Sequence, residues 1–340
     1  MNRVLILLLI AVALLSACRR ETRHHLTKGY DLVIYTTGTW SDGFLREAIP
    51  TFEAEHACRV YVEPFANIAR LRRHLLSERE HPVADVIVGL DNSWSQIVLA
   101  DSVLSPYRPQ AFGAVPQRYI YDASWRQTPL CWAWLAFIYD SRSVPQPPQT
   151  MAQMTISNPL TPYIIVHPDS TTIGRALFDW TSGYFGYSGF DKFWQGMRGN
   201  VLTIESDWEK AYHRFLAGEA SYVPGHATRP CYHEMSEASD RYRAFIPVEG
   251  GYRHIEALGI VRDCRHRALA ENFVNFCLRA DVQALLPTSQ WTLPVRDGVG
   301  VPQCFDDAPT SEKDFGEPEP QQEVQRFLDR LWREWREAME

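Results

Sequence analysis

The stretch ADVIVGLDNS, residues Ala84 to Ser93, carries the pattern that decides the predicted fold. Residues 85–90 read DVIVGL and, after the first aspartate, are rich in branched aliphatic side chains, which is typical of a short strand that is buried on both faces. Such strands belong to parallel sheets that helices cover on each side. The polar residues 91–93 then fall at the carboxyl end of a strand, where open α/β sheets bind their ligands.

The order of strand, loop and helix repeats on both sides of this stretch. Further strands are predicted at residues 31–36, 59–62, 163–166, 201–204 and 221–223, with longer apolar runs at 130–139 and 254–261. Helices are predicted at residues 44–56, 68–79, 173–183, 190–197, 208–216, 268–278 and 323–339, and a surface loop at 306–322. We therefore predict two α/β lobes joined by two or more extended crossings. Lobe I comprises residues 30–129 with 256–340, and lobe II comprises residues 130–255.

The composition is compatible with two lobes and argues against one class of partner. A chain of 340 residues, 45% of them hydrophobic, is long enough to bury a large core. Its net charge is −7 and it has no run of Lys and Arg, which argues against nucleic acid as a partner.

The first residues predict export. Residues 1–17 combine a short basic start with an apolar run that is too short to span a bilayer comfortably, as in a signal peptide. Leu15 to Cys18 reads LSAC and resembles a bacterial lipobox, in which Cys18 becomes the lipid-modified first residue of the mature protein. The alternative is an ordinary cleaved signal in which Cys18 has no role. Residues 18–29 are polar and predict a flexible tether, so the expected location is the periplasm, on a lipid anchor.

The sequence does not decide whether the other six cysteines form disulfides or remain free thiols. They are Cys58, Cys131, Cys231, Cys264, Cys277 and Cys304. An even number in an exported protein is compatible with one or more disulfides, but the spacing fixes no pairing, and buried free thiols explain it equally well. Neither C-x-x-C nor H-E-x-x-H occurs, so no metal or redox centre is predicted.

Hydroxyl residues gather at the predicted helix starts. Ser170, Thr171 and Thr172 precede a helix, where they act either as helix caps or as donors to an anion such as phosphate. Ser206 has the capping-box spacing to Glu209, and this places Trp208 in the first turn of the helix. A role as a helix cap is also predicted for Asp91.

Lone aromatic residues lie beside these loops. Trp40, Trp208, Tyr232 and Trp291 occupy polar loop contexts, whereas most other tryptophans lie in apolar runs and are expected in the core. Any one of the four alone would be explained by packing. Four of them on loops that converge at one edge would suit a flat and cationic heteroaromatic ligand, through stacking and cation–π attraction.

Five segments carry a resemblance to a known family. They are ADVIVGLDNS (84–93), FIYD (137–140), WEKAYHRFLAGEAS (208–221), RPCYH (229–233) and LPTSQWTLPV (286–295). On these segments the chain resembles the thiamine-binding proteins of bacterial ABC importers, which are type II periplasmic binding proteins. The resemblance implies a two-lobed fold with a hinge and an interlobe cleft. It also implies a monomeric solute-binding protein, with neither enzyme activity nor cofactor. Such a protein captures thiamine, thiamine monophosphate or thiamine diphosphate and delivers it to a permease and its ATPase.

The resemblance also implies roles for single residues. Trp208, Tyr232 and Trp291 are similar to family aromatics that stack on the pyrimidine and thiazolium rings, and Thr171 matches a hydroxyl close to the phosphate end. The predicted ligand-binding residues are Trp40, Thr37, Asn67, Ser170, Thr171, Thr172, Trp208, Arg229, Tyr232 and Trp291.

Three positions depart from the family pattern. Thr37 stands where the family often has the first residue of a Tyr-Asp pair. Asn67 stands where an Asp would pair with the aminopyrimidine or the thiazolium charge. Arg229 replaces a small polar residue, and its positive charge beside the expected aromatic cage favours a phosphorylated ligand.

Three other functions are compatible with the same scaffold. A ferric-ion site needs paired tyrosines and a carboxylate, and Tyr232 has no tyrosine next to it; a polyamine site needs several acids at the strand ends. The candidate acids are Asp91, Asp169, Glu205 and Asp207. A thiamine-degrading enzyme needs a nucleophilic cysteine, for which Cys131 and Cys231 are the candidates, with His226 or His233 as the base.

Overall fold

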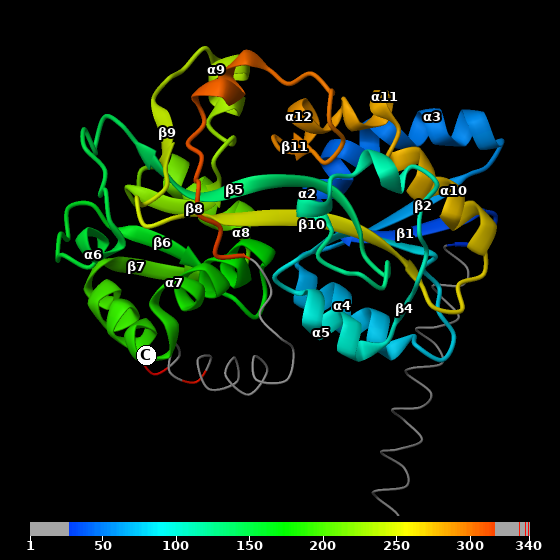
Figure 1. Ribbon diagram of the computed structural model, residues 1–340, viewed down its shortest axis with the longest axis horizontal. Coiled ribbons are helices and arrows are strands. Elements are labelled where there is room, and N and C mark those ends of the chain that lie inside the picture. The colour runs from blue at the N-terminus through cyan, green and yellow to red at the C-terminus, as the bar shows by residue number, and fades with distance from the viewer. Residues whose placement is uncertain (1–26, 317–332, 334–336, 338, 340) are drawn as a thin grey trace, which may run out of the picture.

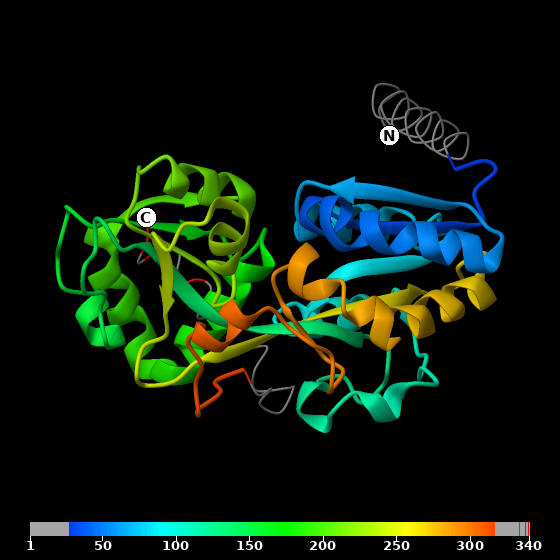
Figure 2. The same cartoon turned by 90° about the horizontal axis from the view of Figure 1, so that it is seen from above.

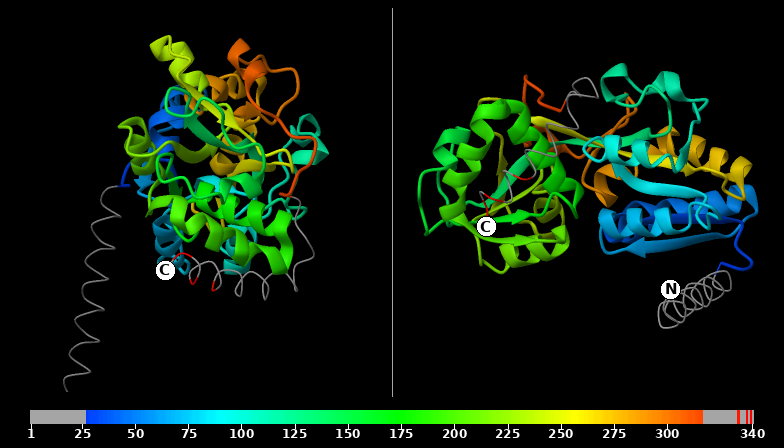
Figure 3. Two further views of the ribbon diagram at one scale, coloured as in Figure 1. Left: turned by 90° about the vertical axis from the view of Figure 1, so that its left-hand side faces the viewer. Right: turned by 90° about the horizontal axis from the view of Figure 1, so that it is seen from below.

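The structure is a computed structural model that describes residues 27–316 together with Arg333, Glu337 and Met339. Two α/β lobes lie side by side, as Figure 2 shows from above and the right panel of Figure 3 from below. Two long strands, β5 (Thr128–Asp140) and β10 (Tyr252–Val261), run between the lobes and pair antiparallel to each other (Figure 1). The predicted pair of lobes with extended crossings is confirmed, and residues 130 and 255, the predicted lobe boundaries, lie within these two strands.

Lobe I is built on a sheet that is covered on both faces. Along β1, Leu32 and Ile34 pack into the core beneath α3 and α10, whereas Val33 and Tyr35 pack into the core beneath α4 and α5. Side chains of a strand alternate between its faces, so a strand covered on both sides is apolar throughout. The main elements are β1 (Leu32–Thr37), α2 (Gly38–Trp40), η1 (Ser41–Leu45), α3 (Arg46–His56), β2 (Val60–Phe65), α4 (Ile68–Ser77), β3 (Val86–Asp91), α5 (Ser95–Asp101), β4 (Leu104–Ser105), η2 (Phe112–Ala114), η3 (Gln117–Tyr119), α10 (Arg267–Cys277), α11 (Ala280–Gln283), α12 (Leu286–Ser289) and β11 (Leu293–Pro294).

Lobe II repeats this plan with a second small parallel sheet, in which β6 lies between β7 and β8. Aromatic side chains such as Trp180, Phe190 and Trp194 fill its core, as predicted for the tryptophans in apolar runs. The elements are α6 (Met151–Met154), β6 (Tyr163–Val166), α7 (Thr172–Met197), η4 (Arg198–Asn200), β7 (Val201–Glu205), α8 (Trp208–Leu216), β8 (Tyr222–His226), α9 (Cys231–Glu237) and β9 (Tyr242–Phe245), followed by η5 (Gln303–Asp307) from the C-terminal segment.

One sheet runs through both lobes, in the order β2-β1-β3-β10-β5-β8-β6-β7. Its strands are parallel within each lobe, but β10 runs antiparallel to β3 and β5 runs antiparallel to β8. The predicted parallel sheet is therefore present in each lobe, and the crossing strands, whose direction the sequence pattern left open, pair antiparallel. The two crossing strands join the lobes because β10 pairs with β3 of lobe I, β5 pairs with β8 of lobe II, and β5 and β10 pair with each other.

Two predicted helix boundaries coincide with breaks in the backbone. The helices predicted at 173–183 and 190–197 are the two halves of α7, which is divided at Gly186, where φ is +59° and the backbone is non-helical. The helix predicted from residue 44 begins directly after Gly43, whose non-helical backbone interrupts η1, and it continues through α3.

The predicted signal peptide, Cys18, most of the tether and most of the tail helix lie outside the described residues. Within the described part of the chain, no helix has both the length and the apolar character that a membrane crossing requires.

Candidate functional site

The loops that follow the strands of the two lobes contact each other. The Asn67 side-chain amide lies 3.4 Å from the Ser206 carbonyl oxygen, and the Trp94 indole nitrogen lies 3.4 Å from the Thr171 carbonyl oxygen. The Ser93 hydroxyl lies 3.4 Å from the carbonyl oxygen of Thr172. The carboxyl ends of the strands, where the sequence predicts the site, therefore face one another across the two lobes.

Aromatic side chains of lobe II surround one arginine. The guanidinium carbon of Arg229 lies 5.6 Å from the ring centroid of Trp208, 5.0 Å from that of Tyr212 and 4.8 Å from that of Tyr232. Trp208 stacks on Tyr212, with centroids 4.8 Å apart and ring planes at 16°. Tyr232 meets Trp291 edge-on, with centroids 5.4 Å apart and planes at 81°. We call Trp208, Tyr212, Tyr232 and Trp291 the aromatic cluster; the predicted association of Trp208, Tyr232 and Trp291 is thus present.

The members of the aromatic cluster differ in how much surface they expose. Trp208, Tyr232 and Arg229 are half-buried, whereas Trp291 is only 8% exposed and packs with Cys231, Cys304 and Phe305. Trp291 therefore serves mainly as packing behind Tyr232, and Tyr212 covers one face of the Trp208 indole. The Nε–H of Arg229 is buried and has no hydrogen-bond partner among the described residues. It is one of several buried arginine Nε–H groups in the described structure that have no such partner, and it is available to an acceptor on a bound ligand.

Trp40 does not join this cluster, contrary to its predicted position on a loop that converges with the others. It lies in α2, is 2% exposed and donates from its indole nitrogen to the Glu256 carboxylate at 3.2 Å. The ring packs on Gly89, where an added Cβ would lie 2.7 Å from the indole and where φ is +91°. Because Gly89, the glycine of VIVGLD, has no side chain, the Trp40 ring fits against it and is buried in the core of lobe I.

The hydroxyl residues at the start of α7 serve mainly as caps. The Thr171 hydroxyl accepts from the Gly174 amide at 2.9 Å and lies 3.1 Å from the His167 carbonyl oxygen. Thr171 is buried, while Ser170 and Thr172 remain half-buried. The structure thus supports the capping interpretation for Thr171, and a phosphate contact of Ser170 or Thr172 stays a prediction.

The predicted N-cap residue of α8 is wrong. Asp207, and not Ser206, is the N-cap residue, because its carboxylate accepts from the Lys210 amide at 2.9 Å. A carboxylate is favoured at this position by the positive end of the helix dipole. Trp208 is nevertheless in the first turn, as predicted.

Asn67 and Thr37 also lie at the facing edge of the lobes. Asn67 caps α4 by accepting from the Arg70 amide at 3.0 Å, and its side-chain amide reaches the Ser206 carbonyl oxygen of the other lobe. The hydroxyls of Thr37 and Thr39 lie 3.4 Å apart at the end of β1.

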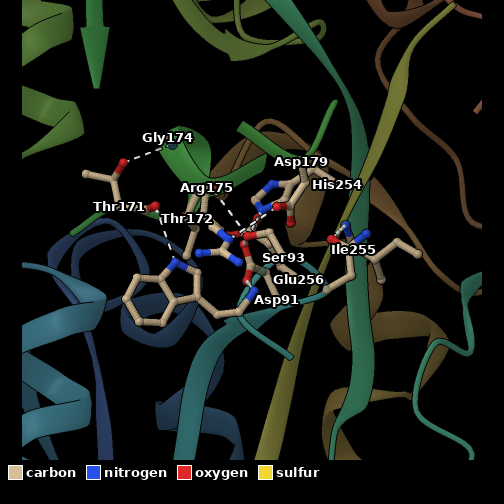
Figure 4. A network of polar contacts seen from close by, with 12 residues as sticks. Asp91, Ser93, Thr171, Thr172, Gly174, Arg175, Asp179, His254, Ile255 and Glu256 are labelled. Carbon is tan, nitrogen blue, oxygen red and sulfur yellow. Dashed lines mark hydrogen bonds and ion pairs between the residues drawn. The ribbon is translucent and has the colours of Figure 1, made fainter. Parts of the chain in front are cut away.

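A buried polar network lies beneath this edge (Figure 4). His254 on β10 bonds to the Asp91 carboxylate at 2.6 Å through Nε2 and to His226 on β8 at 2.8 Å through Nδ1. Next to them, Arg175 and Asp179 form an ion pair at 3.2 Å. Asp91 also accepts from the Trp94 amide at 2.8 Å, which resembles the predicted capping role, although α5 begins later at Ser95. The network connects β3 of lobe I with β8 of lobe II through the crossing strand β10.

Burial and charge shift the titration of this network. Burial disfavours protonation of His254, but its hydrogen bond to Asp91 and the charge of that carboxylate outweigh burial, so its pKa is raised. Burial lowers the pKa of His226 well below its ordinary value, and the charge of His254 acts in the same direction. Burial raises the pKa of Asp179 to about 7, despite the opposing charge of Arg175. Burial also raises the pKa of Glu256.

Sequence reasoning missed this network. A signal was present, since His254 and Glu256 alternate in the otherwise apolar crossing run HIEALGIV, and alternate residues of a strand share a face. His226, His254 and Glu256 bring three potential metal ligands within 4.8 Å of one another, although the two imidazole nitrogens bond to each other instead.

The cysteines proposed for an enzyme are unsuited to nucleophilic attack. Cys131 is fully buried and donates to Glu256 at 3.6 Å, and burial raises the pKa of its thiol well above the ordinary value. Burial also raises the pKa of the Cys231 thiol. The candidate bases are engaged elsewhere, because His233 bonds to Tyr212 and Glu237, each at 2.8 Å, and His226 bonds to His254.

Proteins with sequences similar to this chain share one description, thiamine-binding periplasmic protein. A thiamine-binding periplasmic protein of Brucella abortus biovar 1 is 29% identical over 290 residues, which is 83% of this chain and 84% of the relative. The protein of the same description from Escherichia coli strain K12 is 27% identical over 258 residues, 75% of this chain and 77% of the relative. Both are described as binding proteins.

Solved structures share the two-lobed fold. A periplasmic thiamin binding protein superposes with a TM-score of 0.84 at 25% identity, over 91% of this chain and 96% of that chain. The apo ferric ion-binding protein A of Pasteurella haemolytica superposes with a TM-score of 0.74 at 12% identity, over 90% of this chain and 97% of that one, which shows the fold alone. The family model described as bacterial extracellular solute-binding protein matches residues 81–316, more than half of the chain. The chain therefore belongs to the bacterial extracellular solute-binding proteins.

Proposed function

We propose that this protein binds thiamine or its phosphate esters in the periplasm and delivers them to an ABC importer. The observation that carries the proposal is the aromatic cluster around Arg229, at the edge where the strand-end loops of the two lobes meet. Its relatives described as thiamine-binding support the same ligand. Trp208 and Tyr232 stack on the ligand rings, and binding closes the two lobes through the crossing strands β5 and β10.

Arg229 makes a phosphate ester the better ligand. A guanidinium beside the rings repels a thiazolium and attracts a phosphate, and its unpartnered Nε–H is a donor that a phosphate oxygen satisfies. We therefore propose thiamine monophosphate or thiamine diphosphate as the preferred ligand, with Ser170 and Thr172 as further phosphate donors.

The other ligands on this scaffold fit less well. A ferric ion finds no adjacent tyrosine beside Tyr232, whose chain neighbours are Cys231 and His233. A polyamine needs free carboxylates, but Glu205 is paired with Lys210 and Arg214, and Asp207 caps α8. Asp91 is bonded to His254.

A fluorescence titration of the purified protein with thiamine and its mono- and diphosphates tests the proposal. We expect saturable quenching of tryptophan emission at micromolar or lower ligand, because Trp208 lies in the proposed site. No response to any of the three ligands, with another small molecule found by mass spectrometry in the native preparation, would refute it.

Export and lipid attachment are part of the proposal. The sequence over residues 15–18 supports lipid modification at Cys18. Labelling of cells with a radioactive fatty acid is expected to mark the wild-type protein and not the Cys18→Ser variant. Equal labelling of the two, or none in the wild type, would contradict the anchor.

A further inference from the structure

Two cysteine thiols of the described residues lie against each other. Cys231 is the first residue of α9 and Cys304 lies in η5, and these two elements pack together although 73 positions separate the cysteines in sequence. Both side chains belong to one buried hydrophobic cluster with Trp291 and Phe305, and each thiol is among the groups that shift the pKa of the other.

The other four thiols belong to, or pack against, one core cluster of lobe I, but none of them is among the groups that shift the pKa of another. The charges beside Cys58 are Asp31 and Glu53, and those beside Cys264 include Asp85 and Arg267. Cys131 donates to Glu256, and Cys277 is buried among apolar side chains of lobe I. The fold thus distinguishes one pair that the spacing of six cysteines leaves open.

We propose that Cys231 and Cys304 form a disulfide in the exported protein. The two thiols together lose two protons and two electrons, and the sulfur–sulfur bond forms as a dithiol–disulfide oxidoreductase of the oxidising compartment is reduced from its disulfide to its dithiol form. The inference rests on the export that the proposed function includes.

The bridge forms during folding. In the folded chain Cys231 is 4% exposed and Cys304 is 7% exposed, so an oxidant protein has little access to either sulfur. Burial also raises the pKa of both thiols, which leaves little of the reactive thiolate. Oxidation therefore precedes the docking of η5 on α9.

The bridge affects the ligand site through Tyr232. This residue follows Cys231 on α9 and meets Trp291 edge-on, and Trp291 precedes the segment that leads to Cys304. A bond between the two cysteines fixes α9 against that segment and holds Tyr232 in place beside Arg229. We expect reduction to lower the melting temperature by roughly 5–10 °C, given the long loop that the bridge closes. We also expect it to weaken ligand binding by a few-fold.

Thiol trapping of the full-length exported protein tests the bridge. Cells are quenched in acid, and the protein is alkylated under denaturing conditions before reduction and again after it with a second reagent, then mapped by peptide mass spectrometry. We expect Cys231 and Cys304 to carry only the second reagent and a linked peptide to appear without reduction. Cys231→Ser is expected to expose Cys304 to the first reagent, whereas the control Cys58→Ser leaves the pair protected.

A second experiment, on purified protein, tests the disulfide without requiring that the protein is exported. The reduced protein is unfolded and refolded in a buffer of reduced and oxidised glutathione, and the same linked peptide is expected. First-reagent labelling of both cysteines in either experiment, or a linked peptide that joins other cysteines, overturns the proposal. Ligand titration is a separate readout, so a bridged protein that binds no thiamine ester refutes the proposed function and leaves the bridge standing.

Discussion

Replacement of Arg229 by Gln is expected to invert the preference between phosphorylated and unphosphorylated thiamine. The substitution removes the guanidinium that lies 4.8 Å from the Tyr232 ring and 5.6 Å from the Trp208 ring, while it keeps a side chain that can donate a hydrogen bond. Because a phosphate and a thiazolium have opposite charges, loss of this cation acts on them in opposite directions. The ratio of the two affinities is therefore more informative than either affinity.

The magnitude is worked for a ligand charge that lies about as far from Arg229 as the rings do. Two unit charges about 5 Å apart interact by about 3 kcal/mol at an effective dielectric constant of about 20. A charge-assisted hydrogen bond contributes about 1.5–3 kcal/mol net, so the diphosphate should bind roughly 10- to 150-fold more weakly to Arg229→Gln. Thiamine itself gains about 0.5–1 kcal/mol when a like charge near its ring is removed, which tightens it by about two- to five-fold.

Isothermal titration calorimetry with the two ligands measures this ratio. Arg243→Gln is the matched control, because Arg243 is an exposed arginine whose substitution makes the same change of net charge. Thermal unfolding checks that the variant is folded, since Arg229 also covers Tyr212. An equal loss of affinity for both ligands would show that Arg229 acts as packing only, and the charge argument would then be wrong.

Three further predictions concern the lobes and the buried network. Asn67→Asp keeps the cap of α4 and adds a carboxylate at the facing edge, so thiamine should bind about 5- to 30-fold more tightly in calorimetry; weaker binding would show that the bond to Ser206 matters more. Asp91→Asn leaves His254 without its buried counter-ion and should lower the free energy of unfolding by about 3–5 kcal/mol in urea titrations; a loss below about 1 kcal/mol would contradict the pairing. The contribution of Asp179 and His254 to stability should fall as pH rises from about 4 to beyond 7, because their raised pKa values mean that the folded state holds protons that the unfolded state has released. The lowered pKa of His226 acts in the opposite direction below about pH 6.5. Asp179→Asn should flatten this slope between about pH 4 and 7, and an unchanged urea-midpoint profile would rule out the assignment.

Much of the fold could be predicted from the sequence because it is encoded locally. The run LVIY is apolar at every position because both faces of β1 are covered, and the periodicities of the first strands and helices place them within a few residues of their observed bounds. The antiparallel crossing could not be predicted in this way. Strand direction depends on pairings such as that of β10 with β3, and no local pattern specifies them.

The candidate site was also predicted only in part from the sequence. Aromatic residues in polar loops pointed to Trp208 and Tyr232, and the structure brings both to Arg229. The same signal failed for Trp40, because a loop context does not show that Gly89 leaves a space for its indole. Trp291 lies between these cases, since it touches Tyr232 but is largely buried.

The sequence by itself determined the two α/β lobes and the strand ends at which polar and aromatic residues gather, and its N-terminal pattern predicts export. Only the tertiary structure decided which side chains meet: His254 with Asp91 and His226, and Cys231 with Cys304. The spacing of hydrophobic residues shows which face of a helix or strand is buried, and this spacing can be read from a few neighbouring residues. A contact between residues 73 or 163 positions apart depends on how whole elements pack, and that information is spread over the core.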